Sequence, residues 1–325
     1  MDISDRLQKD SDQKFGIGVM TDANSLIQYN RKIVPVSPAI DVGLGGGIPE
    51  GSWVIISGGE KVGKTSTALQ IAANAQQLDK FIYFYTIEGR IKKRDLESMH
   101  NLDVNKNFKI VHSTQEKFMA SEDFLDHIIK IIKSHPSCVI IMDSVSALCS
   151  RSEFDAGITG QARSFGPKLL ASFCRQMGTI IPVQDVILIM TQHLIANTSG
   201  YGSPFMEDGG RKVQYQVDVK LRCKSVTPWK VQENQIGQVI SWEVKSSALS
   251  GIPGTKIQSY LRYGYGLDFE AELFNLGIDF GLIEKASSWF TILEQKIQGE
   301  NASIEFLRNN PEYTQKLNDT IRNMI

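Results

Sequence analysis

The sequence predicts an α/β fold in which a mostly parallel central sheet is flanked by helices, and two observations favour it. Apolar runs of strand length recur along the chain, at WVIIS (53–57), FIYFYTI (81–87), CVIIMD (138–143) and VILIMT (186–191). Segments such as TALQIAANAQQL and FLDHIIKIIKSH lie between these runs, with apolar residues at the three- and four-residue spacing of amphipathic helices. Strands that are apolar throughout and separated by helices are typical of parallel sheets covered on both faces.

The same patterns divide the chain into three parts. Residues 1–35 are polar and are expected to form an arm with a short helix at SDRLQKD. Residues 36–264 are expected to form the core, in which YQVDVKLRC, QVISWEVKS and KIQSYLRYG extend the sheet as antiparallel hairpins. Residues 265–325 combine short helices with a strand region at SSWFTILEQKIQG, so we expect a small α/β C-terminal domain.

Composition excludes several classes of protein. No run of 18 apolar residues occurs and the N-terminus MDISDRLQKD is charged, so we expect a cytoplasmic protein without membrane contact. The net charge of -1 gives no general attraction to nucleic acid, so any such contact would depend on a local patch. The cysteines lack CxxC spacing, and we interpret all of them as reduced core thiols: Cys138, Cys149, Cys174 and Cys223.

A phosphate-binding loop follows the first apolar run. The segment matches G-x-x-x-x-G-K-[ST] between a predicted strand and a predicted helix, with Gly58, Gly59, Glu60, Lys61, Val62, Gly63, Lys64, Thr65 and the adjoining Ser66 as nucleotide-binding residues. Backbone N–H groups and the helix N-terminus would surround the phosphates, Lys64 would reach the β- and γ-phosphates, and Thr65 would ligate Mg²⁺. The motif therefore predicts ATP and Mg²⁺ as cofactors. A glycine-rich turn without a ligand is the alternative.

Two carboxylates end predicted strands, where the ligands of open α/β sheets gather. Asp143 ends CVIIMD and is interpreted as the Walker B acid that holds Mg²⁺, although an acidic cap on the next helix would look the same. Glu88 follows FIYFYTI in the same way, and we interpret it as a residue that would polarise the water that attacks the γ-phosphate. The pattern alone fits an exposed loop glutamate nearly as well.

Together these segments resemble the RecA recombinase family, in its bacterial RecA or phage UvsX-like branch. The resemblance runs from about Phe15 to the C-terminus and includes the phosphate loop, QKFGIGVM, VIIMDSVSAL, GGRKVQYQVDVKL and GLIEKASSWF in the family's order. It implies a P-loop NTPase core of the RecA type, with Glu88 as the catalytic glutamate and Gln192 as the sensor of the γ-phosphate.

The resemblance also implies two flexible DNA-binding loops, near 152–162 and 193–210. Residues expected to contact the DNA backbone are Arg163, Gly209, Gly210 and Arg211. Residues expected to wedge between bases, unless they pack on the protein's own surface, are Ile158, Phe205 and Met206.

Several positions depart from the family pattern. Lys245 matches one of two lysines that reach the neighbouring subunit's ATP, but Ser247 occupies the second position. Tyr215 stands where the family has an interface phenylalanine, and GRIKKRDLE after Glu88 lacks the aromatic that stacks on adenine. The arm lacks most of the helix that docks on a neighbour.

The implied function is that of a DNA-dependent ATPase active in homologous recombination and DNA repair. ATP-bound copies would form a helical filament on single-stranded DNA and pair it with homologous duplex DNA, through a head-to-tail interface that does not close into a ring. A hexameric helicase or motor with the same core, and a nucleotide-binding recombination mediator, are the alternatives.

Overall fold

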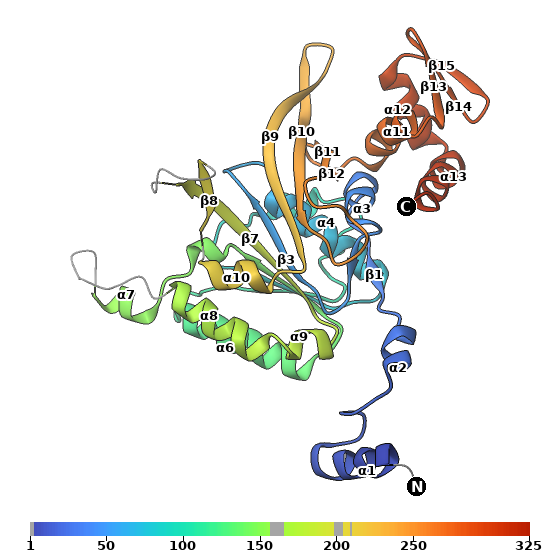
Figure 1. Ribbon diagram of the computed structural model, residues 1–325. Helices are drawn as coiled ribbons and strands as arrows, with labels where there is room; N and C mark the ends of the chain where they lie inside the picture. The colour runs from blue at the N-terminus through green and yellow to red at the C-terminus, as the bar shows by residue number, and fades with distance from the viewer. Residues whose placement is uncertain (1–2, 157–165, 198–203, 209) are drawn as a thin grey trace. The chain divides into compact units, whose positions relative to one another are not determined.

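The computed structural model describes residues 3–156, 166–197, 204–208 and 210–325 (Figure 1). The chain divides into two compact units, residues 1–32 and residues 33–325. The first unit holds α1 (Ile3–Phe15) and α2 (Ala23–Gln28). Helix α1 is longer than the SDRLQKD segment expected from the sequence, because the polar residues that follow continue the helical turns. The Gln8 side chain bonds Asp12 one turn later at 3.3 Å, and it donates to the Met20 carbonyl at 2.5 Å.

A large mixed sheet forms the centre of the second unit. Among the described residues it has ten strands, in the order β12-β11-β10-β9-β3-β7-β6-β4-β5, with β8 paired to β7. Their bounds are β3 (Trp53–Gly58), β4 (Ile82–Thr86), β5 (Phe108–Val111), β6 (Val139–Asp143), β7 (Ile187–Ala196), β8 (Phe205–Glu207), β9 (Val219–Val231), β10 (Asn234–Ser246), β11 (Lys256–Arg262) and β12 (Gly266–Leu267). Neighbouring strands are parallel along the part of this order that runs from β9 through β3, β7, β6 and β4 to β5. Antiparallel pairing adds β10, β11 and β12 at one edge and β8 on β7. The predicted α/β class is confirmed.

Helices cover both faces of this sheet (Figure 1). Residues of α3 (Pro38–Leu44) and α4 (Lys64–Gln77) share one apolar cluster with the sheet, and residues of α6 (Ser121–Ser134), α8 (Gly166–Met177) and α9 (Ile180–Val183) share the other. Along β3, Val54 and Ile56 belong to the first cluster, and Trp53 and Ile55 to the second. Burial on both faces explains why the strands read as continuous apolar runs.

Smaller elements complete the core. They are β1 (Ile33–Val34), β2 (Ile48–Pro49), α5 (Lys93–Glu97), the 3₁₀ turn η1 (Val145–Ala147), α7 (Arg151–Ala156) and α10 (Arg211–Gln216). Strands β1 and β2 pair with each other, outside the large sheet. None of the helices within the described residues combines the length and the apolar composition needed to cross a bilayer.

The C-terminal segment builds a small antiparallel sheet and three helices. Its elements are α11 (Phe269–Asp279), β13 (Ile283–Ala286), β14 (Trp289–Ile292), β15 (Gln295–Gln298), α12 (Glu300–Asn309) and α13 (Pro311–Arg322). A third apolar cluster joins them to Trp229 of β9 and Tyr260 of β11. Buried polar contacts add to this packing, since Glu272 accepts from the Ala39 backbone N–H at 2.9 Å and Arg322 donates to Asp41 at 2.6 Å.

The two expected DNA loops are partly regular structure. Helix α7 occupies 151–156 at the start of the first loop. Strand β7 continues to Ala196, and β8 pairs back on it with Leu194 opposite Glu207 and Ile195 opposite Met206. Polar and glycine residues in this stretch obscured the strand pattern. Ile158, Arg163 and Gly209 lie outside the described residues.

Candidate nucleotide site

The phosphate loop joins the end of β3 to the start of α4 and is held tightly. Gly63 has a φ of 88°, a conformation that favours glycine, and a Cβ at this position would lie 2.6 Å from Cδ1 of Ile240. The amide of Gln238, also on β10, donates to the Lys61 carbonyl at 3.3 Å. Packing against β10 therefore fixes the loop between strand and helix, with the N-terminus of α4 directed at its centre.

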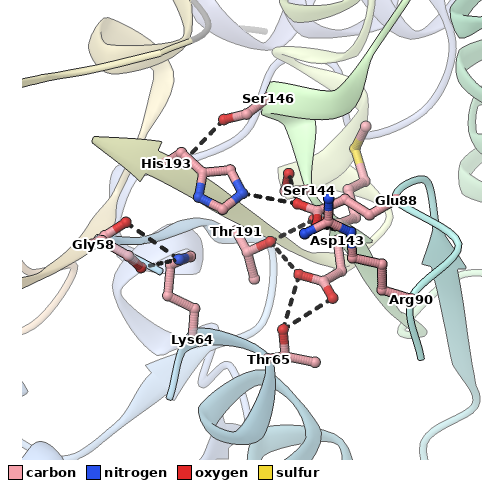
Figure 2. Close-up of polar contacts among 12 residues, drawn as sticks. Gly58, Lys64, Thr65, Glu88, Arg90, Asp143, Ser144, Ser146, Thr191 and His193 are labelled. Atoms are coloured by element: carbon pink, nitrogen blue, oxygen red, sulfur yellow. Dashed lines mark hydrogen bonds and ion pairs between the residues drawn. The ribbon is translucent and has the colours of Figure 1, made fainter. Parts of the chain in front are cut away.

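Lys64 lies inside this loop and its side chain is largely buried. The ammonium group donates to the carbonyl oxygens of Gly58 at 3.2 Å and Gly59 at 2.5 Å (Figure 2). Burial lowers the pKa of Lys64, while the nearby negative charges of Asp143 and Glu88 oppose that shift. The Lys64 ammonium group thus lies at the centre of the loop, where phosphate oxygens are able to replace the two carbonyl oxygens as its hydrogen-bond acceptors.

Asp143 ends β6 and meets two threonine hydroxyls. The Thr65 hydroxyl lies 3.0 Å and 3.2 Å from the two carboxylate oxygens, and Thr191 of β7 donates to Oδ1 at 2.5 Å (Figure 2). Burial raises the pKa of Asp143, and these two hydrogen bonds oppose the rise. Hydroxyl and carboxylate oxygens are the ligands that Mg²⁺ prefers, so the juxtaposed Thr65 and Asp143 fit a magnesium site.

Glu88 lies next to Thr65 and Asp143 in the cleft and accepts hydrogen bonds from two donors of its own. Its Oε1 accepts from the Ser144 hydroxyl at 2.5 Å and from Nε2 of His193 at 2.9 Å (Figure 2). Partial burial tends to raise the pKa of Glu88, but the bonds from Ser144 and His193 outweigh it and the pKa is lowered. The carboxylate is therefore held ionised beside the phosphate loop.

His193 was missed in the sequence. It follows Gln192 on β7 and lies opposite Gly58, the last residue of β3, where polar side chains gather, and its place after the apolar run was the available signal. Gln192 itself is fully buried: its amide donates to the Asp208 carbonyl, and its oxygen accepts from Gln214 at 3.1 Å. The structure thus brings His193, and not Gln192, into contact with Glu88.

These groups line one cleft of about 590 Å³. Its lining includes Lys64, Thr65, Glu88 and Asp143 together with the aromatic side chain of Tyr263. The wall also includes Glu60, Lys61, Ser66, Leu69, Arg94, Met99 and His193. A lysine in a glycine-rich loop, a hydroxyl–carboxylate pair and an aromatic side chain in one cleft are groups suited to binding a nucleotide. The sequence placed no aromatic residue after Glu88, and Tyr263 enters the cleft from the segment after β11 instead.

Other predicted residues lie apart from this cleft. Lys245 on β10 pairs with Glu243 at 2.8 Å, while the Ser247 hydroxyl donates to the Leu44 carbonyl at 2.7 Å within the same chain. Tyr215 on α10 is 83% exposed, far more than a core aromatic. Phe205 and Met206 are exposed on β8, and Gly210 and Arg211 stand at the start of α10. Val62, within the phosphate loop, packs against the first apolar cluster and lines a second pocket with Lys64 and Thr65.

Comparison with known proteins identifies the family of this chain. The model of the RecA N-terminal domain matches residues 3–268, and that of the RecA C-terminal domain matches residues 271–325. Protein RecA of Campylobacter jejuni subsp. doylei is 27% identical over 98% of this chain and 92% of its own length. Protein RecA of Nitratiruptor sp. is 28% identical over 97% and 90%, and that of Thermotoga maritima 27% over 90% and 82%. The chain belongs to the RecA family of recombinases, which are DNA-dependent ATPases, as the sequence motifs predict.

Proposed function

We propose that this chain binds ATP with Mg²⁺ and, in that state, assembles with further copies into a helical filament on single-stranded DNA. The filament then pairs the strand with homologous duplex DNA in recombination and repair. The observation that carries the proposal is the shared cleft in which the phosphate loop, the Thr65–Asp143 pair and Glu88 meet.

Each group in the cleft has a part in ATP hydrolysis. Lys64 is proposed to replace its two carbonyl acceptors with β- and γ-phosphate oxygens, which carry more negative charge. Thr65 and Asp143 would hold Mg²⁺, which neutralises charge that builds up on the phosphates. Glu88, kept ionised by Ser144 and His193, would accept a hydrogen bond from the attacking water.

The proposed DNA surface lies along the β7–β8 hairpin, formed by Ile187–Ala196 and Phe205–Glu207. Phe205 and Met206 are 52% and 47% exposed, so both apolar side chains are available to contact bases. Gly210 and Arg211 begin α10, three residues beyond the end of β8, and are proposed to meet the DNA phosphates. With Arg163, Gly209 and Ile158 they complete the proposed DNA-binding set.

Tyr215 supports the proposed filament contact, because so exposed an aromatic ring on α10 is suited to burial against a second copy. Lys245 is proposed to reach the neighbour's ATP after leaving Glu243. Ser247 is bonded within its own chain and would not contribute the second cation.

The decisive experiment compares phosphate release and strand exchange in the natural chain, in Lys64→Ala and in Lys109→Ala, a matched removal of an exposed lysine on β5. We expect single-stranded DNA to stimulate ATP hydrolysis in the natural chain and in Lys109→Ala, and to have no such effect in Lys64→Ala. Electron microscopy with a slowly hydrolysed ATP analogue should show filaments on DNA. Closed rings would instead support a helicase, and DNA-stimulated hydrolysis without strand exchange would support a mediator. Retention of strand exchange in Lys64→Ala would reject the assignment of the loop.

A further inference from the structure

A histidine on the strand that leads to the proposed DNA surface touches the carboxylate proposed to activate water. His193 lies on β7, and its Nε2 is 2.9 Å from Oε1 of Glu88 on the segment after β4 (Figure 2). One residue lies on a strand and the other on the segment after another strand, and both line the nucleotide cleft. Their side chains are 31% and 18% exposed, so the bond is largely sheltered from competing water.

Neighbouring residues on β7 face in different directions. Gln192 is enclosed between the Asp208 carbonyl and Gln214, whereas His193 projects into the cleft. This follows from the alternation of side chains along a strand. The residue of β7 that meets Glu88 in this chain is therefore His193.

Two hydrogen bonds hold the backbone of His193, one at its N–H group and one at its carbonyl oxygen. The backbone N–H of His193 donates to the Ser146 hydroxyl at 3.0 Å, two residues after Ser144, which itself donates to Glu88. The carbonyl of His193 accepts from the backbone N–H of Asp208 at 3.1 Å. One residue thus joins η1, the Glu88 carboxylate and the residue that follows β8.

That second backbone bond connects the nucleotide cleft to the β7–β8 hairpin. Asp208 follows β8, on which Met206 pairs with Ile195 and Phe205 pairs with Ala196. A shift of β8 when DNA is bound would be carried by the ladder to the backbone of His193. Its ring, and with it the bond to Glu88, would then shift as well.

We propose that His193 is a positioning residue that sets Glu88 for the attack of water and transmits the position of the β7–β8 hairpin to it. DNA-stimulated hydrolysis then depends on the imidazole donor. The inference rests on the proposed ATPase and DNA-binding function of the same site.

The test uses full-length His193→Leu, His193→Gln and His135→Leu. Leucine removes the donor, and the glutamine amide keeps one. His135 provides a matched control, because its Nδ1 also makes a hydrogen bond of 2.9 Å, to the Tyr83 hydroxyl. It lies before the amino end of β6, whereas Asp143 of the nucleotide cleft lies at the carboxyl end. The measurements are kcat and KM for ATP with and without saturating single-stranded DNA, together with DNA affinity and the midpoint of urea unfolding.

We expect His193→Leu to lower the DNA-stimulated kcat roughly tenfold or more, as the loss of one charge-assisted hydrogen bond predicts. The DNA-free rate should fall less, so the stimulation ratio falls, while KM stays within about twofold because the phosphate contacts are intact. His193→Gln should recover most of the ratio and His135→Leu should keep it. An unchanged ratio in His193→Leu, an equal loss in His193→Gln, or an equal loss in His135→Leu overturns the proposal. Absence of ATP hydrolysis in the natural chain would instead overturn the proposed function.

Discussion

Two pairs of carboxylates in this protein have opposite surroundings. Glu88 and Asp143 line an open cleft and accept hydrogen bonds from hydroxyl and imidazole donors. Asp41 and Glu272 are buried where α3 meets the C-terminal helices. Burial raises the pKa of Asp41 to about 7 despite hydrogen bonds from Val36 and Arg322, and it raises that of Glu272 to about 8 despite the bond from Ala39.

The comparison shows that the charge of an acid in a folded protein depends on the balance between its burial and its hydrogen-bond donors, since burial also raises the pKa of Asp143 despite two donors. At Glu88 the donors outweigh desolvation, so the group stays charged and able to interact with water and phosphate. At Glu272 desolvation dominates and the nearby charge of Asp41 adds to it, which favours the neutral acid. Perturbed acids mark functional sites only when their surroundings leave them accessible.

The largest expected effect comes from Glu88→Gln, which removes the negative charge but keeps the shape. ATP binding should persist, because Lys64, Thr65 and Asp143 are unchanged, whereas hydrolysis should slow by a factor on the order of 10²–10⁴. Single-turnover hydrolysis and equilibrium binding of a labelled ATP analogue measure the two steps. Glu97→Gln on α5, an exposed glutamate paired with Lys93, is the control and should retain the natural rate. A Glu88→Gln chain that hydrolyses ATP normally would remove Glu88 from the reaction.

Glu272→Gln tests the other carboxylate pair through the pH dependence of stability. The pKa of Glu272 is raised from 4.5 to about 8, so the folded chain binds more protons than the unfolded chain within that range. Its contribution to the free energy of unfolding is therefore complete below pH 4.5 and is lost as the pH rises toward about 8. Glutamine cannot ionise, so the variant should be more stable than the natural chain at pH 8, by about 1–3 kcal/mol.

Urea unfolding at pH 5, 6.5 and 8 measures this effect. The decline in stability with pH should become shallower in Glu272→Gln without disappearing, since Asp41 has a raised pKa in the same direction. Glu284→Gln, at an exposed position on β13, should keep the natural slope. Identical slopes in Glu272→Gln and the natural chain would show that Glu272 is ionised in the folded state.

What the sequence predicted correctly is local. The apolar runs identified β3, β4, β6 and β7, because burial on both faces leaves a signal within each strand. The phosphate loop was recognised from consecutive residues and lies between strand and helix as expected. The antiparallel extension by β9, β10 and β11 also followed from local strand patterns.

What the sequence missed depends on register and long-range packing. The bond between His193 and Glu88 requires the order of β4, β6 and β7 in the sheet, which periodicity does not specify. The cleft position of Tyr263 and the burial of Glu272 beside Asp41 likewise join segments far apart in the chain. Strand β8 was hidden because its pairing with β7 spans a polar, glycine-containing stretch.

The smallest expected effect comes from Thr191→Val, which makes Asp143 more like Glu272 by removing one of its donors. Thr191 is fully buried and its hydroxyl donates to Asp143, so a valine of similar shape leaves no room for a replacing water. Asp143 would then keep Thr65 as a hydroxyl donor and bear more of the cost of burial, which weakens its hold on Mg²⁺. We expect the Mg²⁺ concentration for half-maximal ATP-analogue binding to rise roughly tenfold, the equivalent of one hydrogen bond to a charged group. Titration of Mg²⁺ against a fluorescent analogue measures this, and Thr191→Ser, which keeps the hydroxyl, should lie close to the natural chain. Equal Mg²⁺ requirements in Thr191→Val and the natural chain would mean that Thr65 alone keeps Asp143 available, so that one donor suffices to separate a functional carboxylate from a buried one.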